Sequence, residues 1–376
     1  MPSVTPEEGK LAGLVAARMR AIGAEVGQVE SLPGRFSIGA RITAGRPGPR
    51  LILNGHLDTV PPGAHGSWRH PPFAAVVEDG ALYGRGACDM KAGLAIMVDV
   101  ARRIAPWRAD LHGELVLHFA IGEERAEPGT RSLLEAGFGG DVGIVLEPTR
   151  LQVATAQRGG GALRMRWRGR AAHAGVRDEG INPVDEVPGV IAAIAEYDSE
   201  LGRRSHPLLL PATLTPTVIA AGEVPNVLPA DCEILADRRL LPGEDLDRDI
   251  AALRGRLQGL AAATGGVEVV GPEHHWVAST TPEGEFSDLV EKLVEAEGSD
   301  PGEPFGTPFA SDVGCLIESG GVEAITFGPG DIAHAHRVDE RVDLGEVETA
   351  ARVVAAVART LLLADDGAKG TGWTAG

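Results

Sequence analysis

The stretch LILNGHLD, residues 51–58, decides the fold because an apolar run of strand length ends on a histidine and an acidic residue. In an extended strand, residues two apart share a face, so His56 and Asp58 are expected to point the same way. One can bind a metal ion while the other orients it, since a histidine ligand usually donates its second ring N–H to a carboxylate. Without the rest of the chain, His56 is more often an ordinary hydrogen-bonded polar residue.

Other acidic or histidine-bearing segments also follow apolar, strand-like runs or lie near the C-terminus. They are Gly86-Ala87-Cys88-Asp89, Gly122-Glu123-Glu124, Leu146-Glu147-Pro148 and Ala335-His336. They are scattered widely along the chain, so they make chemical sense together only if the fold brings them to one edge of one sheet. The sequence therefore predicts both a fold and a metal site.

Apolar periodicity around these segments predicts an α/β sheet. Strands are expected at 36–42, 51–54, 115–121, 142–146 and 324–327, and helices at 6–23, 90–104, 131–136, 286–297 and 344–363. Strand, helix, strand alternation is typical of a mostly parallel sheet flanked by helices.

The pattern changes after Gln157, where Gly159-Gly160-Gly161 interrupts the chain. The chain then continues with a strand exposed on one face at 162–167, a helix at 183–197, strands at 213–220 and 232–237, a helix at 246–263 and a strand at 267–270. This βαββαβ order predicts a ferredoxin-like α+β unit. We therefore expect residues 1–157 and 272–376 to form a metal-binding catalytic domain, and residues 158–271 to form an inserted domain.

Composition excludes several classes of partner. The 376 residues include 53 acidic and 35 basic side chains, a formal net charge of −18, with 43% apolar residues. Such a surface should repel nucleic acid and anionic membranes, so neither is an expected partner. Cys88, Cys232 and Cys315 lack disulfide or zinc-finger spacing, which fits a reducing cytoplasm. No leader or membrane-spanning run is evident.

Two alternatives concern the acidic segments. Gly84-Arg85-Gly86 begins like a dinucleotide-binding GxGxxG motif, but Asp89 occupies the third glycine position and would repel a pyrophosphate. The Glu123-Glu124 pair is, on its own, more often an exposed acidic loop. Glu147 is harder to dismiss, because a carboxylate that ends an apolar strand needs a partner when buried.

Together the motifs resemble the M20 family of dinuclear zinc amidohydrolases over nearly the whole chain. The resemblance rests on GHLDTVP (residues 55–61), GRG through DMK (84–91), Glu123-Glu124, Leu146-Glu147-Pro148, and Gly328-Pro329-Gly330 through His336 and Asp339-Glu340. Within the family the chain is most similar to the acetylornithine deacetylase and succinyl-diaminopimelate desuccinylase group. The resemblance departs at Gly122, where relatives commonly carry Asp, and in residues 125–128.

The resemblance implies a set of metal ligands. One Zn²⁺ takes His56 and Glu147, the other takes Glu124 and His336, and Asp89 bridges the two. Co²⁺ or Mn²⁺ is also possible, because mixed nitrogen and carboxylate sites accept several metals. His334 is expected to be a bystander.

The resemblance also implies catalytic and substrate-binding residues. Glu123 is the general base and Asp58 orients His56. His173 stabilises the oxyanion and, in dimeric members, enters the neighbouring active site. Four further residues are expected to bind the substrate: Asn226, Arg239, Gly328 and Gly330. A guanidinium or backbone N–H groups would suit a carboxylate on the substrate. Arg238 is the neighbouring alternative to Arg239.

These expectations combine into a metal-dependent hydrolase that cleaves the amide bond of an N-acylated amino acid or related small amine. A dipeptidase or carboxypeptidase of the same family, or a catalytically silent ligand-binding homologue, is the alternative. The expected partners are an N-acyl amino acid or dipeptide-like substrate and a second copy of the chain, joined through the inserted lid and dimerisation domain.

Overall fold

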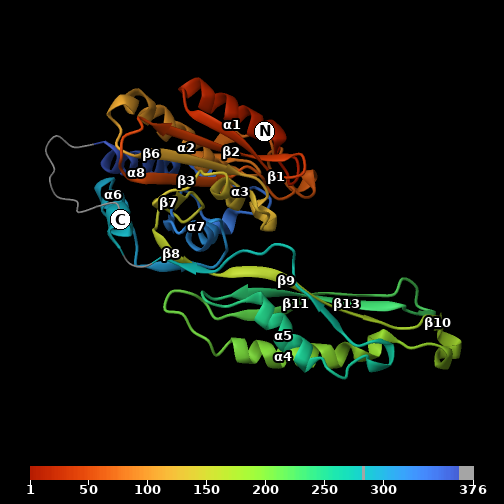
Figure 1. Ribbon diagram of the computed structural model, residues 1–376. Coiled ribbons are helices and arrows are strands. Elements are labelled where there is room, and N and C mark those ends of the chain that lie inside the picture. Colours follow the sequence, from red (N-terminus) through yellow and green to blue (C-terminus); the bar gives the residue numbers. More distant parts are fainter. Residues whose placement is uncertain (282–283, 364–376) are drawn as a thin grey trace. The chain divides into compact units, whose positions relative to one another are not determined.

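The computed structural model describes residues 1–281 and 284–363. The chain divides into two compact units (Figure 1). The first comprises Met1–Ala156, Ser279–Thr307 and the residues from Ser311 onward, and the second comprises Gln157–Ala278 and Pro308–Ala310.

The first unit is built on one large mixed sheet. Its helices and strands are α1 (Gly9–Ile22), β1 (Glu25–Leu32), β2 (Arg35–Thr43), β3 (Arg50–His56), β4 (Val76–Glu78), β5 (Ala81–Tyr83), α2 (Ala92–Ile104), β6 (Glu114–Ala120), α3 (Gly129–Glu135), β7 (Val142–Val145), β8 (Ala154–Gln157), β15 (Ser279–Thr280), α6 (Glu285–Ala296), β16 (Phe305–Thr307), α7 (Val313–Gly320), β17 (Glu323–Thr326), β18 (Arg341–Asp343) and α8 (Leu344–Leu362). The strand order is β1-β2-β6-β3-β7-β17-β8-β15, with β16 paired to β8. The neighbours β6, β3, β7 and β17 run parallel, which confirms the predicted fold class.

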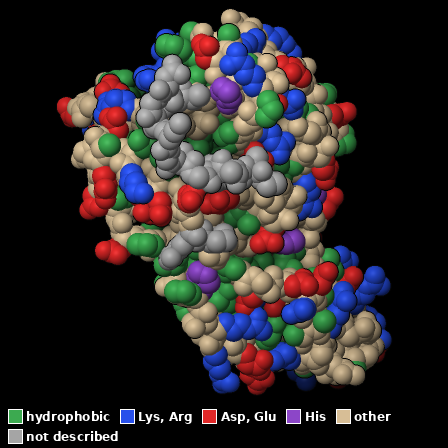
Figure 2. Space-filling model, turned by 60° about the vertical axis from the view of Figure 1, so that its left-hand side comes forward, with side chains coloured by type: hydrophobic (Ala, Val, Ile, Leu, Met, Phe, Trp, Pro, Cys, Tyr) green, Lys and Arg blue, Asp and Glu red, His purple; other side chains and the backbone are tan. Residues whose placement is uncertain are grey.

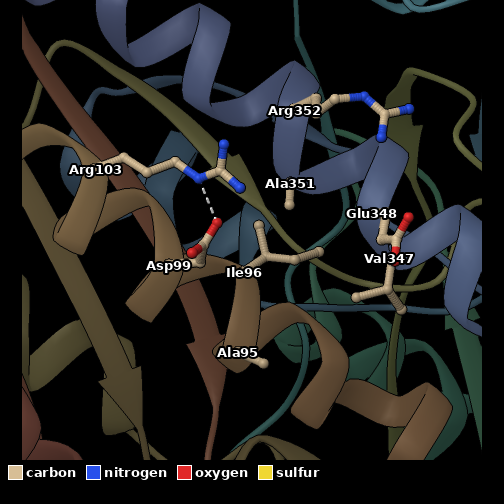
Figure 3. Close-up of a pocket in the computed structure, with 8 residues that line it drawn as sticks. All are labelled: Ala95, Ile96, Asp99, Arg103, Val347, Glu348, Ala351 and Arg352. Atoms are coloured by element: carbon tan, nitrogen blue, oxygen red, sulfur yellow. Dashed lines mark hydrogen bonds and ion pairs between the residues drawn. The ribbon is translucent and has the colours of Figure 1, made fainter.

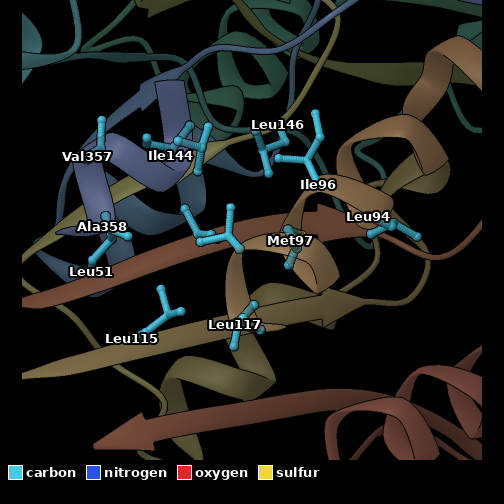
Figure 4. Packing of buried hydrophobic residues seen from close by; sticks show 14 of the residues in the cluster. Leu51, Leu94, Ile96, Met97, Leu115, Leu117, Ile144, Leu146, Val357 and Ala358 are labelled. Atoms are coloured by element: carbon cyan, nitrogen blue, oxygen red, sulfur yellow. The ribbon is translucent and has the colours of Figure 1, made fainter. Parts of the chain in front are cut away.

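Helices cover both faces of this sheet, and the strand sequences explain why. Leu51, Leu53, Leu115 and Leu117 pack in the same cluster as residues of α1, α2, α6 and α8, while Ile52 packs on the opposite face with residues of α3 and α7. Alternate side chains of a strand point to opposite faces, so a strand buried on both must be apolar throughout. Figure 4 shows part of the first cluster, in which Met97 of α2 and Val357 of α8 pack with the strands. Each fully buried leucine contributes roughly 1.5–3 kcal/mol.

The second unit is an antiparallel sheet with helices. Its elements are β9 (Gly159–Arg168), β10 (Ala172–His173), α4 (Val187–Leu201), β11 (Thr213–Ala221), β12 (Val227–Leu228), β13 (Asp231–Leu240), α5 (Leu246–Arg256) and β14 (Glu268–Val270). The order β11-β13-β9-β14 is the ferredoxin-like arrangement that the βαββαβ pattern predicts. Along β9, Leu163, Met165 and Trp167 are buried while the residues between them are exposed.

The structure differs from the sequence prediction in several bounds of this unit, which also contains the unpredicted short strands β10 and β12 and residues Pro308–Ala310. The segment 272–278 lies with the second unit, because Gly160 exchanges backbone hydrogen bonds with Trp276 and Gln157 donates to the carbonyl of Val277. The helix predicted to reach residue 263 ends at Arg256, and the chain then passes through Gly259, whose φ of +96° is left-handed.

Among residues 1–281 and 284–363, no helix combines the length and apolar character that crossing a membrane requires.

Candidate metal centre

Several of the predicted ligands follow the carboxyl ends of neighbouring strands. β3 ends at His56, Glu123 and Glu124 lie in the turn after β6, and Glu147 lies two residues beyond β7. Because β3 pairs in parallel with both β6 and β7, these strand ends meet at the same edge of the sheet. Segments far apart in the sequence thereby come together.

Asp89 and His336 reach this edge from loops. Asp89 lies in a wide helical turn, Ala87–Lys91, which leads into α2. His336 follows β17 and a short helical turn, and its backbone takes a left-handed conformation with φ +57°. Left-handed backbone is uncommon for residues other than glycine, and such strain is concentrated at functional sites.

The two carboxylate oxygens of Asp89 face different histidines. Its Oδ1 atom lies 2.9 Å from Nε2 of His56, and its Oδ2 atom lies 3.0 Å from Nε2 of His336. Glu147 Oε1 lies 3.3 Å from the same nitrogen of His56, and Glu124 Oε2 lies 2.9 Å from that of His336. The side chains therefore form two groups, each with one nitrogen and two oxygens, that share Asp89.

These separations fit metal coordination. With metal–ligand bonds of about 2 Å in a tetrahedral site, neighbouring ligand atoms lie about 3.3 Å apart. Within the described ranges, two overlapping groups of side chains have ligand atoms close enough to hold an ion: His56 with Glu123 and Glu147, and His56 with Asp89 and Glu124. Imidazole nitrogens combined with carboxylates are the donors of catalytic zinc.

The centre carries a surplus of buried negative charge. Burial and the charge of Asp89 raise the pKa of Glu147 to about 7, despite the opposing effect of His56. Burial also raises the pKa of Glu124, with Asp89 adding to the effect, and raises that of Glu123 well above its ordinary value. Hydrogen bonds to Asp89 and Glu124 raise the pKa of His336 to about 10. Divalent cations would offset this excess of carboxylates.

Asp58 supports the centre differently from the prediction. Nδ1 of His56 lies 3.0 Å from the backbone carbonyl oxygen of Asp58 but 3.5 Å from its carboxylate. That carboxylate instead accepts hydrogen bonds from the hydroxyl of Thr5 and from the N–H groups of Glu123 and Glu124, at 2.8, 3.1 and 3.2 Å. The correction arises because β3 ends at His56, so strand alternation no longer applies at residue 58. Asp58 thus fixes the turn that carries the two glutamates.

Glu340 and Arg85 form a second support, whose role the sequence did not reveal. Glu340 is 1% exposed, and its Oε1 atom accepts the N–H groups of Cys88 and Asp89 at 3.0 and 3.1 Å. Its other oxygen lies 2.6 Å from the guanidinium of Arg85. The two residues are 255 positions apart, so only their joint presence in the motifs could have pointed to this contact.

Asp312 was also missed by the sequence prediction. It accepts a hydrogen bond from the hydroxyl of Thr130 at 2.6 Å, and Thr130 in turn accepts one from Asn54 at 2.8 Å. Burial raises the pKa of Asp312 to about 6, and its charge contributes to raising the pKa of Glu123. Its position before the short helix α7 gives no periodic signal.

His173 and Asn226 lie together in the second unit. β10 and β12 pair, so that His173 stands opposite Val227, and the N–H of Ala174 donates to the carbonyl of Asn226 at 2.9 Å. The His173 side chain is exposed, and its Nδ1 accepts the N–H of Gly175.

The adjacent arginines of β13 have different environments. Arg238 is fully buried and pairs with Asp249 and Glu244 at 2.7 and 2.8 Å. Arg239 points to the other face, is 35% exposed and pairs with Asp237. Burial, followed by the charge of Arg239, lowers the pKa of Arg158, a residue that the sequence prediction did not include. The second unit therefore brings two guanidinium groups close together.

The hydrogen bonds of Gly328 and Gly330 correct their predicted role. The N–H of Gly328 donates to the hydroxyl of Thr149 at 3.1 Å, and that of Gly330 donates to the carboxylate of Glu346 at 2.6 Å. A Cβ atom on Gly328 would lie 2.6 Å from the carbonyl oxygen of Glu147. Gly328 therefore allows close packing against the backbone of Glu147, and the N–H groups of both glycines are already used within the chain.

Two other features do not carry a site. A hollow between α2 and α8 is lined by apolar residues such as Ile96 and Ala351. Arg103 also lines it, and its Nε atom lies 2.5 Å from Oδ2 of Asp99 (Figure 3). His334 lies apart from the metal groups, and burial lowers its pKa. On the face of the described residues drawn in Figure 2, acidic and basic side chains are interspersed, without one large basic patch.

The chain is similar in sequence and in fold to known proteins. The chain is 30% identical over 383 residues to a succinyl-diaminopimelate desuccinylase of Alkalilimnicola ehrlichii, covering 96% of both chains. It is 27% identical over 327 residues to an N-formyl-4-amino-5-aminomethyl-2-methylpyrimidine deformylase of Halalkalibacterium halodurans, covering 79% of this chain and 75% of that one. Among solved structures, a dinuclear metal-binding peptidase of Bacillus subtilis matches with a TM-score of 0.71 at 18% identity, covering 96% of this chain and 94% of the other.

A family model described as peptidase family M20/M25/M40 matches residues 52–360, which include all five predicted metal ligands. The match spans most of the first unit and the whole of β9 to β14. The chain therefore belongs to peptidase family M20/M25/M40.

Proposed function

We propose that this M20 hydrolase is a dinuclear metal-dependent deacylase, which releases the acyl group of an N-acylated amino acid or related small amine. The observation that carries the proposal is the position of Asp89, whose two oxygens lie 2.9 and 3.0 Å from the Nε2 atoms of His56 and His336. A carboxylate shared in this way suits two cations better than one.

The proposed ligands are His56, Asp89 and Glu147 for one metal ion, and Asp89, Glu124 and His336 for the other. Zn²⁺ is the proposed metal, with Co²⁺ and Mn²⁺ as substitutes, because this donor set accepts all three. Bound there, the metal pair supplies Lewis acidity, which polarises a substrate carbonyl and makes water easier to deprotonate.

Glu123 is the proposed general base. Its Oε2 atom lies 3.9 Å from Nε2 of His56, farther than the oxygens of Asp89 and Glu147, and this larger separation is why we assign it to proton transfer although it lies within reach of the same ion as His56 and Glu147. Burial and neighbouring carboxylates raise its pKa, and a base works best when its pKa is near the working pH. Glu123 would take a proton from the attacking water and deliver it to the departing amine nitrogen.

Arg239 and Arg158 are proposed to bind the carboxylate of the substrate. A guanidinium matches a carboxylate through two parallel N–H bonds. The guanidinium of Arg158 donates to the backbone carbonyls of Pro211 and Pro308 at 3.3 and 3.1 Å, and the charge of Asp237 acts on it alongside that of Arg239. His173 and Asn226, brought together in the second unit, are proposed to act on the oxyanion and the substrate amide.

The second unit is also the proposed dimerisation domain. β11 is an edge strand, and Val218 and Ile219 on it are 45% and 55% exposed. An exposed apolar edge strand favours pairing with another strand. Ile219→Lys should convert a dimer to a monomer in sedimentation, and an unchanged mass would refute this interface.

The free thiols Cys88, Cys232 and Cys315 support a cytoplasmic location.

The test is metal analysis of the purified chain combined with a hydrolysis screen. The panel should contain acetyl, succinyl and formyl derivatives of ornithine, diaminopimelate, glutamate and neutral amino acids, together with dipeptides. We expect two metal ions per chain and chelator-sensitive release of an amine from at least one acyl amino acid. Activity confined to dipeptides would favour a peptidase, and metal binding without turnover would favour a silent homologue.

A further inference from the structure

We propose that Arg35 is a positioning residue for Glu123, acting through Glu127 at one end of the base-carrying turn and through Glu8 in the N-terminal segment. This inference rests on the proposed function, because it assigns the residue whose position matters as the general base. It concerns residues outside the family motifs.

Arg35 joins two carboxylates. Its Nη1 atom lies 2.5 Å from Oε2 of Glu127, while its Nε and Nη2 atoms both donate to Glu8, the former at 3.2 Å. The exposed fractions of the Arg35, Glu8 and Glu127 side chains are 15%, 1% and 14%. A planar guanidinium can bind one carboxylate with two donors and still reach another, which an ammonium group cannot do in the same geometry.

Glu127 closes the turn that carries Glu123. The N–H of Glu127 donates to the carbonyl of Gly122 at 2.9 Å, and the N–H of Ala126 donates to the carbonyl of Glu123 at 2.8 Å. Gly122 has a φ of +73°, and a Cβ atom there would lie 2.1 Å from Oε2 of Glu127. The Glu127 carboxylate therefore occupies the space that a side chain at position 122 would take in this chain, and Arg35 pairs with it there.

The same turn is held from its other side by Asp58. Asp58 accepts the N–H groups of Glu123 and Glu124 and the hydroxyl of Thr5. Thr5 and Glu8 belong to one short segment, in which the carbonyl of Glu8 also accepts the first N–H groups of α1 from Leu11 and Ala12. The N-terminal segment thus supports the base through Thr5 and Asp58, and again through Glu8, Arg35 and Glu127.

A matched pair of substitutions tests the inference. Arg35→Lys keeps the positive charge but removes the planar guanidinium that binds two carboxylates. Arg41→Lys is the control, because Arg41 lies on the same strand β2 and pairs with Glu114 away from the turn. At saturating metal, we expect Arg35→Lys to lower kcat at least tenfold with KM changed less than twofold, since small displacements of a catalytic group slow the chemical step. Arg41→Lys should leave both constants within twofold.

Hydrogen exchange supplies a readout that does not require turnover. In the metal-free chain, Arg35→Lys and Glu127→Gln should each speed amide exchange in the peptide covering residues 122–127 at least tenfold, with a peptide from α8 unchanged. Amide exchange in the double variant should be no faster than in the more affected single variant, because the two residues act as one unit. Glu127→Gln removes a partly exposed charge, so it covers the case in which Arg35→Lys does not fold.

The outcomes separate the two proposals. If no acyl amino acid is hydrolysed by the unsubstituted chain, the proposed function fails while the exchange data still decide the role of Arg35. If exchange and kcat in the Arg35 and Glu127 variants match those of Arg41→Lys, the positioning role is refuted. A change in KM alone would also refute it, because substrate contacts and not base placement would then have changed.

Discussion

The carboxylate of Glu340 lies 2.6 Å from the guanidinium of Arg85 and also accepts the N–H groups of Cys88 and Asp89. Both side chains of the ion pair are at most 3% exposed. Glu340 thus holds the backbone of the residue whose two oxygens face both histidines. We therefore expect this interaction, which lies outside the proposed ligand set, to affect the geometry of the two proposed metal positions.

Glu340→Gln should weaken metal binding without removing a ligand. The amide still accepts hydrogen bonds, but it loses the charge that orients Arg85 and the Asp89 turn. Supporting partners of this kind are typically worth about 10- to 100-fold in metal affinity, and we expect a loss of this size in a chelator competition titration. Circular dichroism confirms that the variant is folded. Unchanged affinity in the folded variant would assign Glu340 to stability alone.

Glu123→Gln should separate catalysis from metal binding. The amide keeps the size of the side chain but cannot accept a proton, so kcat should fall by roughly 10²- to 10⁴-fold, the usual contribution of a general base. Elemental analysis should still find two metal ions per chain. Its neighbour Glu124 is the matched control, since Glu124→Gln should lose metal as well as activity. Retained turnover in Glu123→Gln would remove Glu123 from the mechanism.

His118 should make stability depend on pH. It is buried, its Nε2 atom lies 2.6 Å from the carbonyl of Phe138, and burial lowers its pKa from 6.5 to about 4. The unfolded chain therefore binds a proton more readily between these pH values, and the stability contributed by neutral His118 is lost as pH falls below 6.5. From pH 7 to pH 5 this loss is about 2 kcal/mol.

The control for this prediction is His118→Gln, which keeps a donor for the carbonyl of Phe138 but does not titrate in this range. Urea unfolding of both proteins at pH 7 and pH 5 measures the difference. The free energy of unfolding of the parent should fall more than that of the variant, by about 2 kcal/mol. Equal losses would show that His118 does not titrate as its burial implies.

Substitution of Arg238 should affect stability, whereas substitution of its neighbour Arg239 on β13 should affect substrate binding. Arg238→Met leaves the buried Asp249 and Glu244 without their shared cation, which typically costs about 3–5 kcal/mol of stability. Arg239→Met should leave stability nearly unchanged and raise KM for carboxylate substrates by roughly tenfold or more, the loss of a charge-assisted hydrogen bond. Thermal unfolding and steady-state kinetics of both variants distinguish these effects. A destabilised Arg239→Met with unchanged KM would reverse the assignment.

Sequence periodicity predicted the long apolar elements well and the short or polar ones poorly. β3, β6 and α8 lie within two residues of their expected bounds at every end, because a buried element repeats its own period regardless of its neighbours. β1 (Glu25–Leu32) was missed, since an edge strand with the sequence EVGQVESL has little apolar character. α7 has only eight residues, two of them glycine, which is too few for a helical period to stand out.

In the candidate site too, some features were predicted from the sequence and others were not. The sequence predicted that His56, Asp89, Glu124, Glu147 and His336 would meet, because parallel strands bring their carboxyl ends to one edge. It did not predict that Asp58 binds His56 through its backbone, or that the N–H groups of Gly328 and Gly330 are already used. Hydrogen-bond partners in loops are set by atoms that converge in space, and loops have no repeating period.

By itself, the sequence determined the fold class, the order of the long apolar strands and helices and the burial of both faces of the large sheet, and it predicted which residues donate to a metal. Only the tertiary structure decided which of two adjacent residues is buried, as with Arg238 and Arg239, and which distant residues support the site, as with Arg85 and Glu340 or Arg35 and Glu127. The reason is physical. Periodicity and side-chain chemistry are local properties of a chain, whereas the partner of a buried charge is fixed by packing between segments that can lie hundreds of residues apart.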